Sequence, residues 1–471
     1  MKSAPERELR LDVGPGFALP DLGGKPLPAR TFTSTYYDTP GRRLLEAGIT
    51  LRRRVENRAG VWQLELPSAD GHVRLEERGG PSRAPEPLLR LLPALLRGGA
   101  ELEPLAKVRR RQAGVAVGTR ADRVDVVVDT IALLEGSRVA RSFTEAEATV
   151  GAGAGSALDR IGKSLRKAGA RNSTGRPELE RLLDGGEQPA PAQDPLGRLR
   201  ELLVEQYRTM VSNDPGVRLG EDPEALHQAR VATRRSRALL RAAHGLVAPD
   251  WAEPLRAELK WLGGLLGPVR DLDVLLEHLD SEAATLEGED ARAFRRLRAR
   301  LAAERREGRE TLLDAIGSER YFRVLDVLAG AGEAPAGDLT KPLAEIAGAA
   351  FACLRKAAKA LPPKPTDDEL HRVRIETKRA RYAAELAAPE LGKSGPRFVD
   401  RAKVLQDVIG EHQDACVAED RLRALALRGG GKTGLAAGRL VERQRRRKRD
   451  ARKAYPAALR SLQKAGRKAF G

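Results

Sequence analysis

A run of cationic side chains at helical spacing gives this sequence its clearest chemical signal. The members follow one another at steps of three, four, three and four residues: His227, Arg230, Arg234, Arg237 and Arg241. On a helix these steps place all five side chains along one face, over roughly 21 Å. Like charges at this spacing repel one another, so another group must offset them. This first stripe predicts an anion-binding surface; the alternative interpretation is an ordinary solvated face.

The same pattern occurs again 144 positions later. The segment from Leu226 and the segment from Leu370 match residue by residue, and a second pair of similar segments begins at Lys260 and Lys403. The second stripe consists of His371, Arg374, Lys378 and Arg381. The C-terminal half is therefore an internal duplication. We include Lys260 and Lys403 among the candidate anion-binding residues.

The histidines of this half have two interpretations. An imidazole at His227 or His371 could donate to a phosphate oxygen or act as a general acid, and a nearby phosphate would raise its pKa. Alternatively, each histidine caps or braces its helix. His412 lies two positions before Asp414 in the segment GEHQDA, so these two side chains are expected to orient each other or a cation.

Charged residues in the N-terminal part alternate with apolar ones at the period of a β-strand. Acidic positions alternate near its two ends, at Glu6 and Glu8, followed by Arg10, and at Glu145 and Glu147. Cationic positions alternate between them, at Arg52, Arg54, Lys107, Arg109 and Arg111. The pattern predicts a charged interior. Carboxylates are hard ligands for Mg²⁺ or Mn²⁺ and cations neutralise phosphate oxygens, so this interior would suit a metal-bound phosphate chain.

The composition agrees with an anionic partner. The 471 residues include 84 Lys+Arg against 66 Asp+Glu, a net charge of +18, which favours a polyanion. Aromatic residues make up only 4%, which argues against the base-stacking platforms that bind single-stranded nucleic acid. The two cysteines, Cys353 and Cys416, are expected to be buried thiols in a reducing compartment. Neither a signal peptide nor a membrane span is predicted, so we expect a cytoplasmic protein.

The elements that must position these residues fall into two parts. A stretch rich in Gly and Pro from Leu182 to Gly197 predicts a linker, with the boundary near Gln193. Before it, strands are predicted over 31–37, 50–55, 61–66, 72–77, 120–128 and 141–150, and short helices over 86–96 and 158–168. After it, long amphipathic helices are predicted over 196–212, 225–245, 251–266 and 291–316.

These motifs resemble two known domain families. The segments ERELR at Glu6, TYYDTPGRRLLEAGITLRRR from Thr35, WQLELP from Trp62 and FTEAEATV from Phe143 resemble the CYTH domain of the triphosphate tunnel metalloenzymes. The two cationic segments, with the GxxxDxDV and GEHQDA segments that follow them, resemble the CHAD domain, a conserved-histidine α-helical domain. The resemblance divides the chain into 1–185, a linker over 186–193, and 194–471, with repeats over about 194–335 and 340–471.

The resemblance implies an α+β multidomain protein: an N-terminal antiparallel β-barrel that forms a triphosphate tunnel, followed by an all-α domain of two duplicated helical bundles. The tunnel family binds Mg or Mn and hydrolyses or cyclises triphosphates. The implied metal ligands are Glu6, Glu8, Glu145 and Glu147. The implied catalytic residues are Glu6, Glu8 and Arg10, and the implied substrate-binding residues are Arg52, Arg54, Lys107 and Arg109. The CHAD resemblance implies that both stripes bind inorganic polyphosphate, and therefore an association with polyphosphate granules.

The sequence departs from the family pattern at several positions. Arg10 replaces a Lys, Glu65 stands where a Lys is usual, and Thr149 replaces a third acid. The Lys expected before the linker is Arg176 or is missing. A lost charged contact to phosphate costs about 1.5 to 3 kcal/mol. Three functions stay open: a polyphosphate-binding protein whose tunnel hydrolyses triphosphate weakly or not at all, an active metal-dependent inorganic triphosphatase, and, on net charge alone, a nucleic-acid-binding protein.

Overall fold

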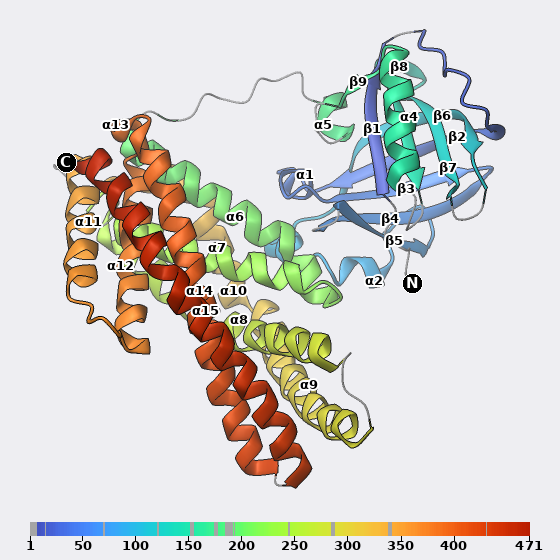
Figure 1. Ribbon diagram of the computed structural model, residues 1–471. Coiled ribbons are helices and arrows are strands. Elements are labelled where there is room, and N and C mark those ends of the chain that lie inside the picture. Colours follow the sequence, from blue (N-terminus) through green and yellow to red (C-terminus); the bar gives the residue numbers. More distant parts are fainter. Residues whose placement is uncertain are drawn as a thin grey trace. The chain divides into compact units, whose positions relative to one another are not determined.

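The structure, a computed structural model, contains an antiparallel sheet and a set of long helices (Figure 1). It describes residues 7–14, 16–68, 71–119, 122–150, 155–173, 178–183, 192, 194–243, 245–283, 288–337, 342–429 and 431–471. The chain forms two compact units, Met1–Pro189 with Val211–Ala225, and Ala190–Met210 with Leu226–Gly471. Apart from residue 192, the predicted linker lies outside the described residues.

The sheet of the first unit has nine strands, and neighbouring strands are antiparallel. The strands are β1 (Arg7–Val13), β2 (Lys25–Asp38), β3 (Thr50–Glu56), β4 (Ala59–Ser68), β5 (Gly71–Arg78), β6 (Glu103–Val117), β7 (Val124–Glu135), β8 (Arg138–Val150) and β9 (Arg171–Asn172). Their order is β5-β4-β3-β2-β6-β7-β8-β1-β9. The antiparallel class is confirmed, but the sheet is open within the described residues. Exposed Arg74, Glu76 and Arg78 protect the β5 edge, since charged edge strands pair poorly.

Short helices accompany the sheet: α1 (Arg43–Glu46), α2 (Glu86–Leu89), α3 (Pro93–Leu96), α4 (Gly155–Lys167) and α5 (Glu178–Leu183). The helix predicted over 86–96 is divided into α2 and α3, because Pro93 lacks the amide hydrogen that would continue it. Helix α4 packs against the apolar face of β1, β7 and β8, where Ile161 and Leu165 meet the small residues Ala146 and Ala148. Strand alternation therefore leaves the charged residues of these strands on the other face.

The second unit is helical, as predicted. The helices that follow the predicted linker are α6 (Pro195–Leu219), α7 (Pro223–Ala242), α8 (Pro249–Ala283), α9 (Gly288–Ile316), α10 (Glu319–Ala329), α11 (Leu343–Lys359), α12 (Asp367–Leu386), α13 (Ala388–Leu391), α14 (Ser394–Gly429) and α15 (Gly431–Phe470). Helix α8 extends well beyond the predicted range of 251–266, through Pro268. Pro268 has no amide hydrogen to donate to the carbonyl oxygen of Gly264. Gly264 is exposed, so water can donate to this oxygen instead.

Two apolar clusters hold the long helices together. One lies between α11, α12, α14 and α15 and contains Phe351, Val373, Phe398 and Leu462. The other joins α8, α9, α14 and α15, which run side by side in Figure 1. No helix in the described part of the chain is both long enough and apolar enough to span a membrane.

Candidate functional site

One face of the sheet collects charged side chains from most of its strands. Residues directly opposite one another on antiparallel strands point to the same face. The register pairs Tyr36 with Arg52, Phe32 with Arg110, Asp129 with Glu145, and Arg10 with Glu147. This charged face is continuous from β5 to β1.

A cavity of about 130 Å³ lies on the charged face. Its lining residues are Arg10, Arg30, Phe32, Arg52, Arg54, Glu65, Arg74, Arg110, Gln112 and Glu147. The structure thus brings the predicted Arg10, Arg52, Arg54 and Glu147 together.

Other predicted residues of this site have different outcomes. Lys107 and Arg109 are not among the residues that line the cavity; Arg110 and Gln112, on the opposite face of β6, line it instead. Glu6 lies outside the described residues, and Glu8 is placed only by its backbone pairing with Thr149. The sequence pattern could not fix the side of β6, because cations occupy both faces of this strand from Arg109 to Arg111.

Each of the six arginines that line the cavity has a carboxylate partner. The ion pairs are Arg10 with Glu147, Arg30 and Arg54 with Glu56, Arg52 and Arg74 with Glu65, and Arg110 with Asp129. Burial opposes ionisation of Glu65, but Arg52 and Arg74 outweigh it and lower the pKa of Glu65 to about 2. Glu65, a departure from the family pattern, therefore neutralises two potential phosphate contacts.

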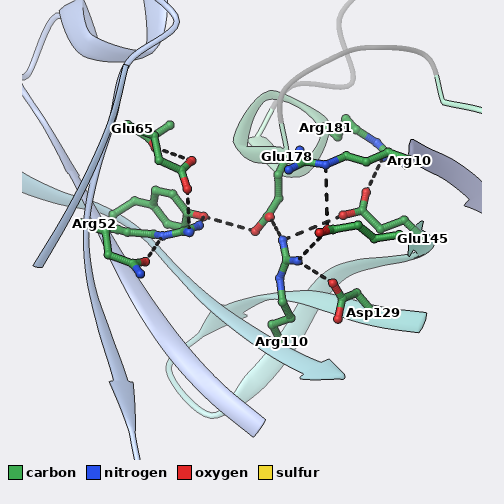
Figure 2. A network of polar contacts seen from close by, with 12 residues as sticks. Arg10, Arg52, Glu65, Arg110, Asp129, Glu145, Glu178 and Arg181 are labelled. Carbon is green, nitrogen blue, oxygen red and sulfur yellow. Dashed lines mark hydrogen bonds and ion pairs between the residues drawn. The ribbon is translucent and has the colours of Figure 1, made fainter. Parts of the chain in front are cut away.

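Arg110 is the centre of the polar network (Figure 2). Its guanidinium donates to Asp129 at 2.5 Å and to Glu178, and lies 3.9 Å from Glu145. Burial opposes the charge of Arg110, but these acids raise its pKa well above the usual value. The same network continues through Tyr36, whose hydroxyl donates to Glu178 at 3.3 Å and accepts from Arg52 at 2.7 Å.

Helix α5 inserts two opposite charges into this network. Glu178 forms an ion pair with Arg110, while Arg181 pairs with Asp12 at 2.9 Å and with Glu145 at 3.2 Å. Leu179 and Leu182 of the same helix are buried against Tyr36, Val108 and Ile131. This helix was not predicted from the sequence.

Three acids of the charged face could hold a divalent cation. Asp129, Glu145 and Glu147 each offer one oxygen, and these oxygens lie within 4.8 Å of one another. Asp129 Oδ1 is buried and accepts no hydrogen bond in the described part of the chain, and burial raises the pKa values of both Asp129 and Glu145. This all-oxygen set fits Mg²⁺ or Mn²⁺. Thr149, in place of a third acid on β8, donates its hydroxyl to Glu147 at 3.2 Å.

Asp129 was missed by the sequence analysis, although its signal was present. It interrupts the apolar run VDVVVD at the period of a strand, two positions after Val127 and four after Asp125. An acid at a buried position of a strand indicates a paired or ligating role.

In the second unit, the two cationic stripes converge. Arg230 and Arg234 of α7 lie close enough to Arg374, Lys378 and Arg381 of α12 to act on them electrostatically. Burial, together with the guanidinium groups of Arg374, Arg234, Arg381 and Arg230, lowers the pKa of Lys378 to about 7. Nearby protein atoms, together with Arg230, Arg374 and Arg381, also lower the pKa of Arg234, which keeps a solvent-exposed part.

The duplication repeats the setting of the central arginines. A Cβ on Gly267 would lie 3.9 Å from the guanidinium of Arg230, and a Cβ on Gly410 would lie 3.4 Å from that of Arg374. Each glycine is followed four residues later by an acid: Asp271 pairs with Arg230 at 3.2 Å, and Asp414 acts electrostatically on Arg374. The stripes themselves contain no acid, but acids of the neighbouring helices α8 and α14 lie beside their arginines. The expectation that the stripes are unpaired is therefore only partly correct.

Glu385 joins the two helices that carry the stripes. Its carboxylate lies 3.4 Å from Arg235 of α7 and 3.5 Å from Arg381 of α12. Buried hydroxyls are satisfied inside each helix, since Thr233 donates to the Ala229 carbonyl and Thr377 to the Val373 carbonyl.

The remaining predicted residues lie around this cluster. Arg237, Arg241, Lys260 and Lys403 are exposed. The Nδ1 atom of His371 is buried and has no hydrogen bond within the described residues.

Two expectations for this unit were wrong. His412 contacts Asp367, at 3.2 Å from Nε2, rather than Asp414. Cys353 is exposed, whereas Cys416 is buried as expected. The acidic partner of His412 comes from another helix, which the local sequence around GEHQDA cannot indicate.

Comparison with known proteins assigns both units. The CYTH domain model matches residues 4–168, and the CHAD domain model matches residues 201–423. An uncharacterized protein of Mycobacterium tuberculosis is 30% identical over 94% of this chain and 92% of its own length. The chain belongs to the proteins that join a CYTH domain to a CHAD domain.

Two solved structures are similar to part of this chain. PptA from Streptomyces chartreusis is 27% identical, with a TM-score of 0.46, over 57% of this chain and all of its own. The CHAD domain from the plant Ricinus communis is 27% identical, with a TM-score of 0.47, over 59% of this chain and 95% of its own.

In the CYTH domain, Glu65→Gln should lower the free energy of unfolding by about 2 to 4 kcal/mol at neutral pH, because it leaves Arg52 buried without its partner. Since the folded pKa of Glu65 is depressed, its contribution is present above pH 4.5 and is lost as the pH falls toward 2. Urea unfolding at several pH values measures both effects. Glu86→Gln, at an exposed pair with Arg83, is the control; equal stability of both variants would show that Glu65 is not needed.

In the CHAD domain, Lys378→Met should raise the free energy of unfolding at pH 7 by about 1 to 2 kcal/mol, because it removes a cation from among four arginines. The unfolded chain binds this proton more tightly than the folded one, so the gain should shrink as the pH rises from 7 toward 10.5. Thermal unfolding measures it, with exposed Lys403→Met as the control. A loss of stability in Lys378→Met would contradict the repulsion.

Proposed function

We propose that this protein binds inorganic polyphosphate through its CHAD domain. The observation that carries the proposal is the convergence of five cations from two repeats; burial and the four neighbouring arginines together lower the pKa of the fifth, Lys378, to about 7. Gathering these charges costs free energy that a polyanion would recover. Each neutralised phosphate also releases counterions, so binding should weaken steeply with salt. A cytoplasmic location at polyphosphate granules belongs to the same proposal.

The arrangement favours phosphate chains over single anions. The stripes come from α7 and α12, so a long chain can contact both at once and the second contact becomes intramolecular. Guanidinium groups also match the geometry of phosphate oxygens. A short anion can satisfy only part of this cluster.

For the CYTH domain we propose weak or absent triphosphate hydrolysis. The six arginines of the cavity are already paired with acids of the same domain. A triphosphate would have to displace these carboxylates, including Glu178 from Arg110. Such an exchange of one buried anion for another yields little net binding energy.

The alternative is an active metal-dependent triphosphatase. The cluster of Asp129, Glu145 and Glu147 supports it, since this set fits Mg²⁺ or Mn²⁺. A bound cation there would neutralise phosphate oxygens and stabilise the charge that develops during hydrolysis. Arg10 and Arg110 would then hold the substrate from either side of these acids.

Charge reversal at Arg234 and Arg237 should weaken the binding of long-chain polyphosphate by about tenfold or more, and adding reversal at Lys378 and Arg381 should nearly eliminate it. Tripolyphosphate, which reaches fewer cations, should lose much less affinity in the single-repeat variants. Calorimetry or fluorescence anisotropy on the full chain measures both ligands, with duplex DNA as a competitor.

The matched control reverses two exposed lysines at the end of α11, Lys356 and Lys359. This variant has the same change of net charge and should bind almost normally. Equal losses for long and short chains would show that the repeats bind separately. Equal losses in the control would show that binding depends on net charge alone and not on the stripes. Displacement by DNA at equal phosphate concentration would favour the nucleic-acid alternative.

Hydrolysis of tripolyphosphate with Mg²⁺ or Mn²⁺ should be slow, and Asp129→Asn should lower it by about tenfold or more. Asp125→Asn is the control, because Asp125 lies on the same face of β7 but is only half-buried and pairs with Arg123. Rapid turnover by the unmodified protein would establish the active triphosphatase. Unchanged turnover in Asp129→Asn would show that the acid cluster is not the metal site.

A further inference from the structure

A group of donors distinct from both sites lies where α12, α14 and α15 meet. Asp367 is the first residue of α12, whose start is fixed by a capping box of Thr366 and Glu369. His412 and Cys416 lie one turn apart on α14. The helices that carry these residues pack directly on one another.

The three side chains converge on one another. Asp367 Oδ1 lies 3.2 Å from His412 Nε2, and Asp367 Oδ2 lies 3.3 Å from Cys416 Sγ. Cys416 Sγ lies 3.8 Å from His412 Nδ1. One donor atom from each residue can be chosen so that all three lie within 4.8 Å of one another. Donor atoms around a tetrahedral zinc ion are separated by about 3.3 to 3.6 Å, so small side-chain adjustments would suffice.

His412 has a ligand-like environment that its protein contacts do not satisfy. The residue is 1% exposed, and Nε2 makes no hydrogen bond within the described residues despite its closeness to Asp367. A buried polar atom in this condition is costly unless a partner is supplied. Nε2 is a common metal-ligating atom of histidine.

A cation already occupies the neighbouring position. The Nζ atom of Lys448, from α15, lies 2.8 Å from Asp367 Oδ2 and 3.2 Å from Glu419 Oε2. Arg452 of the same helix also donates to Asp367, and Arg445 donates to Glu419 at 3.0 Å. Glu419 follows Cys416 by three residues on α14 and is buried. An ammonium group between two carboxylates shows that the location favours positive charge, and it links Glu419 to the three converging side chains.

The duplication provides an internal comparison. At the corresponding positions, offset by 143 or 144 residues, the first repeat has Pro223, Val269, Asp273 and Leu276 in place of Asp367, His412, Cys416 and Glu419. The first repeat folds with a single acid there, which pairs with Arg305. The sulfur and nitrogen donors are therefore not a requirement of the bundle.

We propose that Asp367, His412 and Cys416, with Glu419 as a fourth ligand, form a site for a thiophilic divalent metal ion of the zinc type. The mixed sulfur, nitrogen and oxygen donors select against Mg²⁺ and Ca²⁺. On binding, the sulfur forms a bond to the metal, the Cys416 thiol releases its proton to water, and the Lys448 ammonium is displaced. The metal joins the N-terminus of α12, the helix of the second stripe, to α14 and so stabilises the second repeat.

Cobalt(II) is the probe for this site, because its bonds to thiolate give a near-ultraviolet charge-transfer band and tetrahedral coordination gives strong visible bands. The full chain, reduced and freed of metal by a chelator, should develop both bands with one equivalent of Co²⁺ and lose them on addition of Zn²⁺. Cys416→Ser should abolish the charge-transfer band. Cys353→Ser, at the one other cysteine of the chain, should leave it unchanged.

Two further variants separate a metal site from an ion-pair cluster. His412→Gln should weaken Co²⁺ binding by about tenfold or more, and Lys448→Met should strengthen it, because the competing ammonium is gone. Zn²⁺ should raise the melting temperature of the unmodified protein but not that of Cys416→Ser. The proposal is overturned if the unmodified protein gives no charge-transfer band, if the band survives in Cys416→Ser, or if Lys448→Met, folded by circular dichroism, binds Co²⁺ no better.

Discussion

The duplication brings cations of both repeats together in the CHAD domain. Repulsion among these cations is the interaction on which our account of polyanion binding depends. Helices α7 and α12 lie close enough for Arg230, Arg234, Arg374, Lys378 and Arg381 to form one electrostatic cluster, and the ion pair of Arg235 with Glu385 joins the two helices. Glu385 and the acids of α8 and α14 offset part of the repulsion, while burial and the remaining repulsion from four arginines together lower the pKa of Lys378. A polyanion would remove that remainder.

In the CYTH domain, a similar concentration of cations is neutralised by acids of the same domain. Its charged face contains nearly balanced partners, and Arg52 with Glu65 and Arg110 with Asp129 are both largely removed from water. Helix α5 completes the balance by adding Glu178 beside Arg110 and Arg181 beside Glu145. Because buried ion pairs contribute specificity more than stability, this network fixes the positions of the acids and arginines without leaving a strong demand for a ligand. The two domains thus differ in how much unsatisfied charge they present, which is why we assign polyphosphate binding to the helical one.

The sequence could predict those features of the structure that follow from a regular spacing of residues. The stripes, the duplication and the antiparallel strands follow from spacings of three to four and of two residues. Predictions were wrong or missing where the outcome depends on contacts between distant segments. The side of β6 that faces the cavity depends on its register with β2, so Arg110 was not predicted. Asp129 was missed because its partners come from other strands. Helix α8 continues past Pro268 because the carbonyl oxygen of exposed Gly264 can accept a hydrogen bond from water instead of from the helix. The contact of His412 with Asp367 likewise joins residues 45 positions apart.

Calorimetric titration of the full protein with long-chain polyphosphate at about pH 7.5, in two buffers of different ionisation enthalpy, tests the central claim most directly. If the converging cations form the binding site, phosphate will raise the pKa of Lys378 from about 7 and the complex will take up roughly half a proton or more. Lys378→Arg, which stays charged, should bind with little proton uptake. Binding without proton uptake by the unmodified protein, or equal uptake by both proteins, would contradict the account.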